Sequence, residues 1–100
     1  MAPQPLAQPE IDEALALLPG WQVEGDRLTR VYSFDKHLPA AAMALHVATI
    51  QEELNHHTDM TLSYDTLALS VNTHTVGAIT ELDVGLARRI SEIAVAHGAR

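Results

Sequence analysis

The spacing of hydrophobic residues predicts three amphipathic helices. The first has apolar residues at steps of three and four, namely Ile11, Ala14, Leu15 and Leu18, and Pro19-Gly20 ends it. The second begins near Pro39, whose fixed φ suits a first helical turn, and runs toward Asn55 through Met43, Val47, Ile50 and Leu54. The third follows Thr80-Glu81-Leu82-Asp83, which has the spacing of a capping box, and should run to about His97.

Between the helices, apolar and polar residues alternate as in two β-hairpins. In the first hairpin, Trp21 and Val23 precede a turn at residues 24–27, and a β-rich stretch covers residues 28–34. In the second, a short segment at residues 62–64 precedes a turn and an alternating strand at residues 67–71. The order helix, hairpin, helix, hairpin, helix predicts an α+β fold, with helices on one face of a four-stranded antiparallel sheet.

Length and composition indicate one small domain. The chain has 100 residues, 47% of them hydrophobic, but only four aromatic residues, so the core must consist mostly of Ala, Leu, Val and Ile. Small cores of this kind are often supplemented by burial between subunits, which favours a homo-oligomer. Residues 1–9 are rich in Pro and lack the features of a signal peptide or membrane span. We interpret them as a flexible tail before a single domain at residues 10–100 of a cytoplasmic protein.

Charge and cysteine content exclude several classes of function. The net charge of −7 and the scattered Lys and Arg residues argue against direct nucleic-acid binding. The chain contains no Cys, which excludes a disulfide framework, a thiolate nucleophile and a Cys-based zinc site.

Three of the six histidines are candidates for chemistry: His56, His57 and His74. If the second helix extends far enough, Glu52 shares a face with His56, four residues later, and can orient its imidazole. Strand alternation places His74 on the face opposite the helix-covered core. Because a neutral imidazole can both give and take a proton near neutral pH, several in one pocket suit the elimination of water.

These residues also have purely structural interpretations. A His pair at a helix end can be a capping or surface feature, and Glu52 can be a solvated helix residue. Asp83 completes the capping box, a role we favour over direct catalysis. Trp21 can pack in the core or stack on a heterocycle at a pocket rim.

Two further interpretations concern the remaining histidines and metal binding. His37, expected in a loop, and His46 and His97 show no partner spacing, so we take all three as structural or exposed. A site in which the three candidate histidines and an acidic residue hold a divalent metal ion is an alternative to acid–base chemistry, but no HExxH-like spacing supports it.

The run Glu52-Glu53-Leu54-Asn55-His56-His57, followed by Tyr64, His74 and Asp83, resembles the signature of the pterin-4a-carbinolamine dehydratases. The resemblance extends upstream to Gly20-Trp21 and covers roughly residues 10–97. The chain departs from the family at Thr58 and Met60, where the family usually has Pro and often an aromatic residue.

This resemblance implies both a fold and an activity. The fold is a four-stranded antiparallel sheet with three helices on one face, assembled into dimers or tetramers. The activity is dehydration of 4a-hydroxytetrahydropterin to quinonoid dihydropterin in tetrahydropterin recycling, with no metal or organic cofactor. The implied catalytic residues are His56, His57 and His74, without a division into acid and base. Glu52 would orient His56, while Trp21 would lie near the pterin and Asp83 would support the site.

The alternative is an interaction protein. Relatives of the same fold serve as a dimerisation partner of a homeodomain transcription factor or as a Rubisco assembly factor. A pure scaffold has no need for three spaced histidines, which favours the enzyme.

Overall fold

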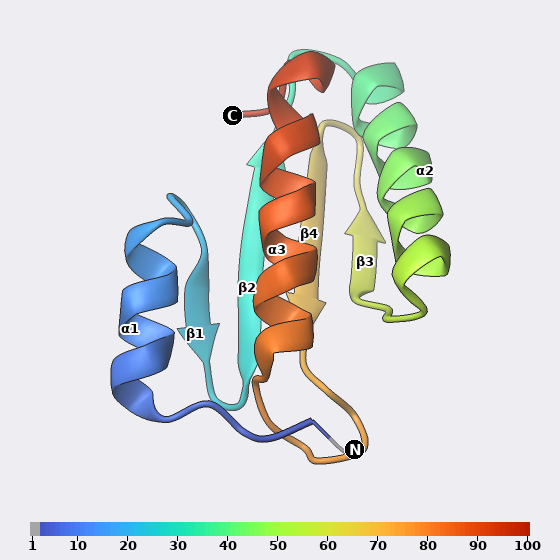
Figure 1. Cartoon of the computed structure of the whole chain (residues 1–100). Coiled ribbons are helices and arrows are strands. Elements are labelled where there is room, and N and C mark those ends of the chain that lie inside the picture. Colours follow the sequence, from blue (N-terminus) through green and yellow to red (C-terminus); the bar gives the residue numbers. More distant parts are fainter. Residues whose placement is uncertain (1–2) are drawn as a thin grey trace.

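The structure is a computed structural model, and it describes residues 3–100. Its helices are α1 (Gln8–Ala16), α2 (His37–Leu54) and α3 (Glu81–Ala94), and a short 3-10 helix, η1 (Val95–His97), follows α3. The strands are β1 (Gln22–Glu24), β2 (Arg27–Ser33), β3 (Asp59–Leu62) and β4 (Thr66–Val71). This order of elements, seen in Figure 1, confirms the predicted α+β fold.

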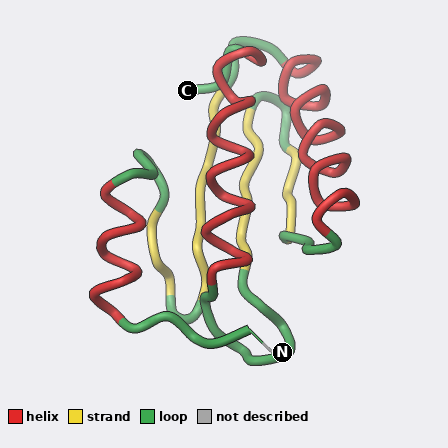
Figure 2. Tube along the Cα trace, in the orientation of Figure 1, coloured by secondary structure: helices red, strands yellow, loops and turns green. Residues whose placement is uncertain are grey.

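The four strands form one antiparallel sheet in the order β1-β2-β4-β3. Both predicted hairpins are present, because β1 pairs with β2 and β3 pairs with β4. The hairpins meet in the middle of the sheet, where β2 and β4 pair from Leu28 and Val71 to Ser33 and Thr66. The long connection between the hairpins contains α2, which runs back alongside β3 (Figure 2).

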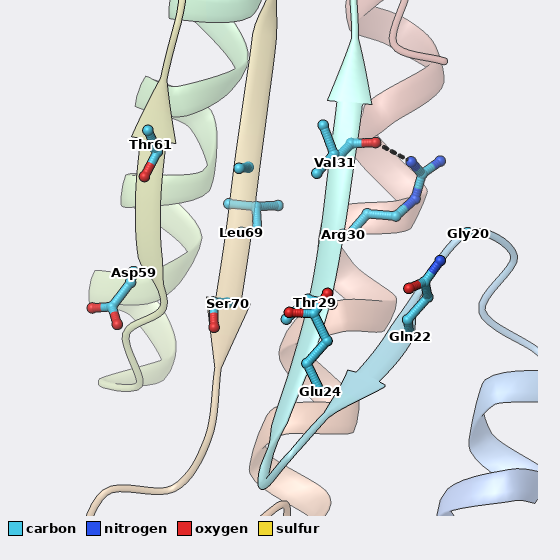
Figure 3. Close-up of a pocket in the computed structure, with 11 residues that line it drawn as sticks. Gly20, Gln22, Glu24, Thr29, Arg30, Val31, Asp59, Thr61, Leu69 and Ser70 are labelled. Atoms are coloured by element: carbon cyan, nitrogen blue, oxygen red, sulfur yellow. Dashed lines mark hydrogen bonds between the residues drawn. The ribbon is translucent and has the colours of Figure 1, made fainter.

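Alternation along the central strands separates a core face from an open face. On β4, Leu67, Leu69 and Val71 face the core and are at most 2% exposed. The intervening residues lie on the other face, and in Figure 3 α2 and α3 lie behind the sheet when this face is viewed. The helices therefore cover one side of the sheet, as predicted.

Apolar side chains of α2 and α3 complete the core. The fully buried ones, at 0% exposure, are Ala40, Met43, Val47, Leu86, Ala87 and Ile90. Met43 and Val47 of α2, and Leu86 and Ile90 of α3, are four residues apart, as in the pattern that predicted the helices. Burial of one such large apolar side chain contributes about 1.5–3 kcal/mol, so this face holds both helices on the sheet. Leu54 and Leu82, which were expected on the same faces, are 41% and 46% exposed.

Element boundaries differ from the prediction at several points. Helix α1 begins at Gln8, and the backbone N–H of Leu6 donates to the carbonyl of Ile79 at 2.9 Å. Residues 6–9, expected in the flexible tail, thus lie against the domain, while residues 1 and 2 lie outside the described part of the chain. Strand β3 begins at residue 59, three positions before the predicted segment.

The ends of α2 and α3 also differ from the predicted ones. Helix α2 begins at His37, which we expected in a loop; Pro39 is tolerated because the N–H groups of the first turn have no partner within a helix. Helix α3 ends at Ala94, and the chain tightens into η1 over the last predicted residues. Within residues 3–100, no helix is both long enough and apolar enough to cross a membrane.

Candidate active site

The candidate site is built on the first turn of α3. Thr80 is the N-cap, and its hydroxyl oxygen accepts the backbone N–H of Leu82 at 3.1 Å. Asp83, at the third helical position, accepts the backbone N–H of Thr80 through Oδ2 at 2.8 Å. The predicted capping box is therefore present, and its carboxylate is completely buried.

A second hydroxyl joins this carboxylate from the loop after β4. Thr73 donates its hydroxyl proton to Oδ2 of Asp83 at 2.9 Å, and its Oγ1 lies 2.6 Å from Oγ1 of Thr80. The loop is held in place because Thr73 forms an isolated β-bridge with Ala78. The buried carboxylate thus binds the end of β4 to the start of α3.

His56 approaches the same carboxylate from the end of α2. Its Nε2 lies 2.6 Å from Oδ1 of Asp83, and its side chain is 12% exposed while that of Asp83 is 0% exposed. A contact this short between a ring nitrogen and a buried carboxylate is a strong hydrogen bond. The structure therefore joins two predicted site residues that lie 27 positions apart.

The turn that presents His56 follows from the end of α2. Asn55 adopts the left-handed conformation, with φ 51°, and the backbone N–H of His56 donates to the carbonyl of Gln51 at 3.1 Å. The buried side chain of Gln51 then accepts the backbone N–H of Thr58 at 2.8 Å. This reversal fixes the His pair between α2 and β3.

Glu52 orients His57 rather than His56. The expected pairing required α2 to continue through residue 56, but the helix ends at Leu54. The reversal at Asn55 brings Nε2 of His57 to 2.8 Å from Oε2 of Glu52. Both side chains are largely exposed, at 52% and 79%, so this pair is much more weakly held than His56 on Asp83.

The sequence model of the family described as Pterin 4 alpha carbinolamine dehydratase matches residues 4–93. The chain belongs to this family. The prediction of a dehydratase, a hydro-lyase, is confirmed at the level of the family.

Individual relatives support the assignment. A Streptomyces avermitilis protein named as a pterin-4-alpha-carbinolamine dehydratase is 56% identical over 100 residues, which cover 99% of each chain. A protein of the same name from Thermomicrobium roseum is 42% identical over 84% of this chain and 90% of its own.

Solved structures show the same fold. The crystal structure of a transcriptional coactivator/pterin dehydratase from Brucella melitensis has a TM-score of 0.87 and 33% identity, covering 91% of this chain and 99% of that one. A pterin dehydratase-like RuBisCO assembly factor of the alpha-carboxysome has a TM-score of 0.62 and 17% identity, over 74% of this chain and 86% of that one. The second likeness shows the fold alone.

The other residues of the family signature lie in different surroundings. His74 is exposed in the turn directly after Thr73, so its backbone is tied to the carboxylate that holds His56. Tyr64 is 71% exposed and stacks on His37, with ring centroids 5.8 Å apart. The structure thus gathers His56, Asp83 and the backbone at His74, while Tyr64 contacts the start of α2.

Trp21 lies in the core and not beside the His56–Asp83 pair. It is 5% exposed, and its indole N–H donates to Oγ of Ser91 at 3.0 Å. Ser91 follows Asp83 by eight residues, or about 12 Å along the helix. Trp21 therefore has a core-packing role, which is one of the two roles expected for it.

Thr73 is a site residue that the sequence analysis missed. Alternation from Leu67 through Leu69 and Val71 continues to Thr73 on the core side. A polar residue on the core side needs a buried hydrogen-bond partner. This requirement is the sequence signal that could have identified Thr73.

Three hollows on the described surface are lined by residues other than the histidines. One of about 480 Å³ lies on the open face of the sheet and is lined by residues such as Gln22, Thr29, Asp59, Thr61 and Ser70 (Figure 3). Two others, of about 510 and 220 Å³, border α1 and the start of α3. Within residues 3–100, no group of three or more His, Asp or Glu side chains is placed to hold a metal ion.

Proposed function

We propose that this chain dehydrates 4a-hydroxytetrahydropterin to quinonoid dihydropterin, in tetrahydropterin recycling in the cytoplasm. The observation that carries the proposal is the imidazole of His56, held 2.6 Å from a buried carboxylate in a member of the pterin carbinolamine dehydratase family. An imidazole supported in this way is suited to accept a proton, since the carboxylate stabilises the cation that forms.

The reaction needs one acid and one base. The C4a–O bond breaks as the hydroxyl group takes up a proton and leaves as water. The N5–H bond breaks as a base removes the proton, and its electrons form the C4a=N5 double bond. Atoms and charge balance without an oxidant or reductant, so the reaction needs no redox cofactor. The proposal includes no metal or organic cofactor.

His56, His57 and His74 are the proposed acid and base groups. Asp83 supports His56 and Glu52 supports His57, each through Nε2 of the ring. His57 and His74 are both exposed, which allows either to meet a substrate that enters from solvent. Trp21 is left out of the proposed site because its indole is buried against α3.

A homodimer or homotetramer is part of the proposal. Leu38 and Leu45 lie seven residues apart on one face of α2 and are 76% and 72% exposed. Exposed leucines on one helical face are typical of a surface that a second subunit covers. Light scattering should give a mass of at least two chains, and Leu45→Glu should reduce it; a monomeric wild-type protein would contradict this part.

The test of the activity is the ultraviolet-monitored conversion of freshly made 4a-carbinolamine. The wild-type protein should exceed the uncatalysed rate, and His57→Ala and His74→Ala should each lower kcat. Asp35→Asn, which changes an exposed residue paired with Arg100, is the matched control and should keep the wild-type rate. A wild-type rate equal to the uncatalysed one would remove the proposal. A stoichiometric metal ion in the purified protein would contradict the cofactor-free mechanism.

A further inference from the structure

The hydrogen bonds around Asp83 fix the direction of every proton on one side of its carboxylate. The backbone N–H of Thr80 can only donate, and it donates to Oδ2 at 2.8 Å. The hydroxyl of Thr73 has one proton and gives it to the same oxygen at 2.9 Å. Oδ2 therefore accepts two protons from fixed donors.

The two hydrogen bonds to Oδ2 also determine which hydroxyl group donates in the contact between Thr73 and Thr80. Because Thr73 uses its proton on Asp83, Thr80 must donate in the 2.6 Å contact between the two hydroxyl oxygens. Thr80 can do so because its own oxygen accepts the backbone N–H of Leu82 at 3.1 Å. All protons in this chain of hydrogen bonds therefore point toward Oδ2 of Asp83.

The other carboxylate oxygen, Oδ1, faces Nε2 of His56 at 2.6 Å. A neutral imidazole with its proton on Nδ1 would place a lone pair against this oxygen with no proton between them. A neutral imidazole with its proton on Nε2 donates a hydrogen bond instead. As the acceptor in this contact, Asp83 thus selects the tautomer of His56 that has its proton on Nε2.

The second ring nitrogen is left available. Among residues 3–100, the buried side-chain nitrogen or oxygen that lacks a hydrogen bond is Nε of Arg30. Nδ1 of His56, which has no hydrogen-bond partner among these residues, is therefore reached by solvent. It carries a lone pair at an accessible position.

We infer that Thr73 and Thr80 are positioning residues that act through Asp83, and that His56 is the base of the proposed dehydration through Nδ1. The inference rests on the proposed function for the identity of the substrate. Nδ1 takes the N5 proton of the carbinolamine, the N5 electrons form the C4a=N5 bond, and the C4a hydroxyl leaves with a proton from His57, His74 or water. The imidazolium that forms keeps its Nε2 proton on Asp83.

Asp83→Asn tests the inference because the hydrogen bonds from Thr73 and Thr80 determine the orientation of the new amide group. The Thr80 N–H requires an acceptor, so the amide oxygen occupies the position of Oδ2 and the NH₂ group faces His56. The NH₂ group then donates to Nε2, and the His56 proton moves to Nδ1. The capping interaction with Thr80 is retained, which favours a folded variant.

The expected results are spectroscopic and kinetic. Nitrogen NMR of the neutral ring should show the His56 proton on Nε2 in the wild type and on Nδ1 in Asp83→Asn. The value of kcat should fall by about 10⁴-fold, as in serine proteases when the corresponding change imposes the wrong tautomer on the catalytic histidine. KM should change little, since Asp83 is buried away from the substrate.

Further variants test whether Thr73 acts by positioning Asp83 and whether the effect is specific to the carboxylate beside His56. Thr73→Val should lower kcat about tenfold at nearly constant KM, because one of the two fixed donors to Oδ2 is lost, and Thr73→Ser should restore it. Glu52→Gln makes the same carboxylate-to-amide change beside His57, where the side chain is 79% exposed and free to rotate. It should leave the His56 tautomer as in the wild type.

The outcomes distinguish this inference from the proposed function. A folded Asp83→Asn protein whose His56 keeps its proton on Nε2 would overturn the tautomer assignment. A reversed tautomer with an unchanged kcat would overturn the role of Nδ1 as the base. A reversed tautomer in a protein whose wild type shows no dehydratase activity would remove the proposed function and leave the network standing.

Discussion

The imidazoles of His46 and His97 face one another, with Nδ1 of His46 2.8 Å from Nε2 of His97. The rings meet nearly edge to face, at an angle of 72°. His46 lies on α2 and His97 on η1, so the contact ties the last turn of the chain to the second helix. Burial, and secondly repulsion from His46, lower the pKa of His97 from its ordinary value of 6.5.

This pair predicts a loss of stability in mild acid. Because the pKa of His97 is lower in the folded protein, the unfolded chain binds more protons just below pH 6.5, and the free energy of unfolding falls as the pH falls through this range. Above this range, His97 no longer lowers the free energy of unfolding. Urea unfolding between about pH 7.5 and 5.5 measures the effect.

Two variants check the cause. His97→Gln should flatten the pH dependence of the free energy of unfolding. His46→Gln should flatten it only in part, because burial is the larger cause of the lowered pKa and remains. An equal slope in the wild type and His97→Gln would show that other groups produce the dependence.

Asn55 gives the second prediction, through its left-handed backbone with φ 51°. Asn55→Ala should reduce the free energy of unfolding by about 1 kcal/mol, since the short polar side chain of Asn tolerates the left-handed conformation better than that of Ala. It should also lower dehydratase activity, because this residue turns His56 onto Asp83. Asn55→Gly should keep both properties. Urea unfolding and the carbinolamine assay measure them, and a stable, fully active Asn55→Ala protein would contradict the prediction.

The fold could be predicted from the sequence because its signals are local. Each helix shows its buried face within a few turns, as Met43, Val47 and Ile50 do in α2. The capping box at Thr80 and Asp83 is also local, and it placed the carboxylate on which the site is built. Element order then limited the possible topologies to very few.

The partners of the site residues could not be predicted in the same way. Whether Glu52 reaches His56 or His57 depends on one backbone angle at Asn55, and Asn is compatible with either outcome. The bond from His56 to Asp83 spans 27 residues, and the contact of His46 with His97 spans 51. The local spacing of residues does not show which side chains meet when they lie this far apart in the sequence.

Trp21 provides the third prediction. Trp21→Phe keeps an aromatic ring in the core but removes the N–H that binds Ser91, and leaves that hydroxyl group without its partner. The free energy of unfolding should fall by about 1–3 kcal/mol from the lost hydrogen bond and the smaller ring. KM for the carbinolamine should not change. A large increase in KM at unchanged stability would instead place the indole against the substrate.

Gly20 provides the last prediction, because it lies against the guanidinium group of Arg30. Gly20 has φ 85°, and a Cβ atom there would collide with Nε and Cζ of Arg30. Arg30 has little freedom to move away, because its guanidinium lies over the ring of Tyr32, 4.0 Å from the centroid, and also bonds the carbonyl of Val31. Gly20→Ala should therefore reduce the free energy of unfolding by more than the 1 kcal/mol or so expected from backbone strain alone.

Gly77→Ala is the matched control for this collision. Gly77 has φ 60°, and a Cβ atom there would meet nothing within 4 Å, so this change measures the cost of the backbone conformation alone. The excess cost at Gly20 should disappear when Gly20→Ala is made in an Arg30→Ala background, since the colliding group is then absent. If the excess persisted in that background, the collision with Arg30 would not be its cause.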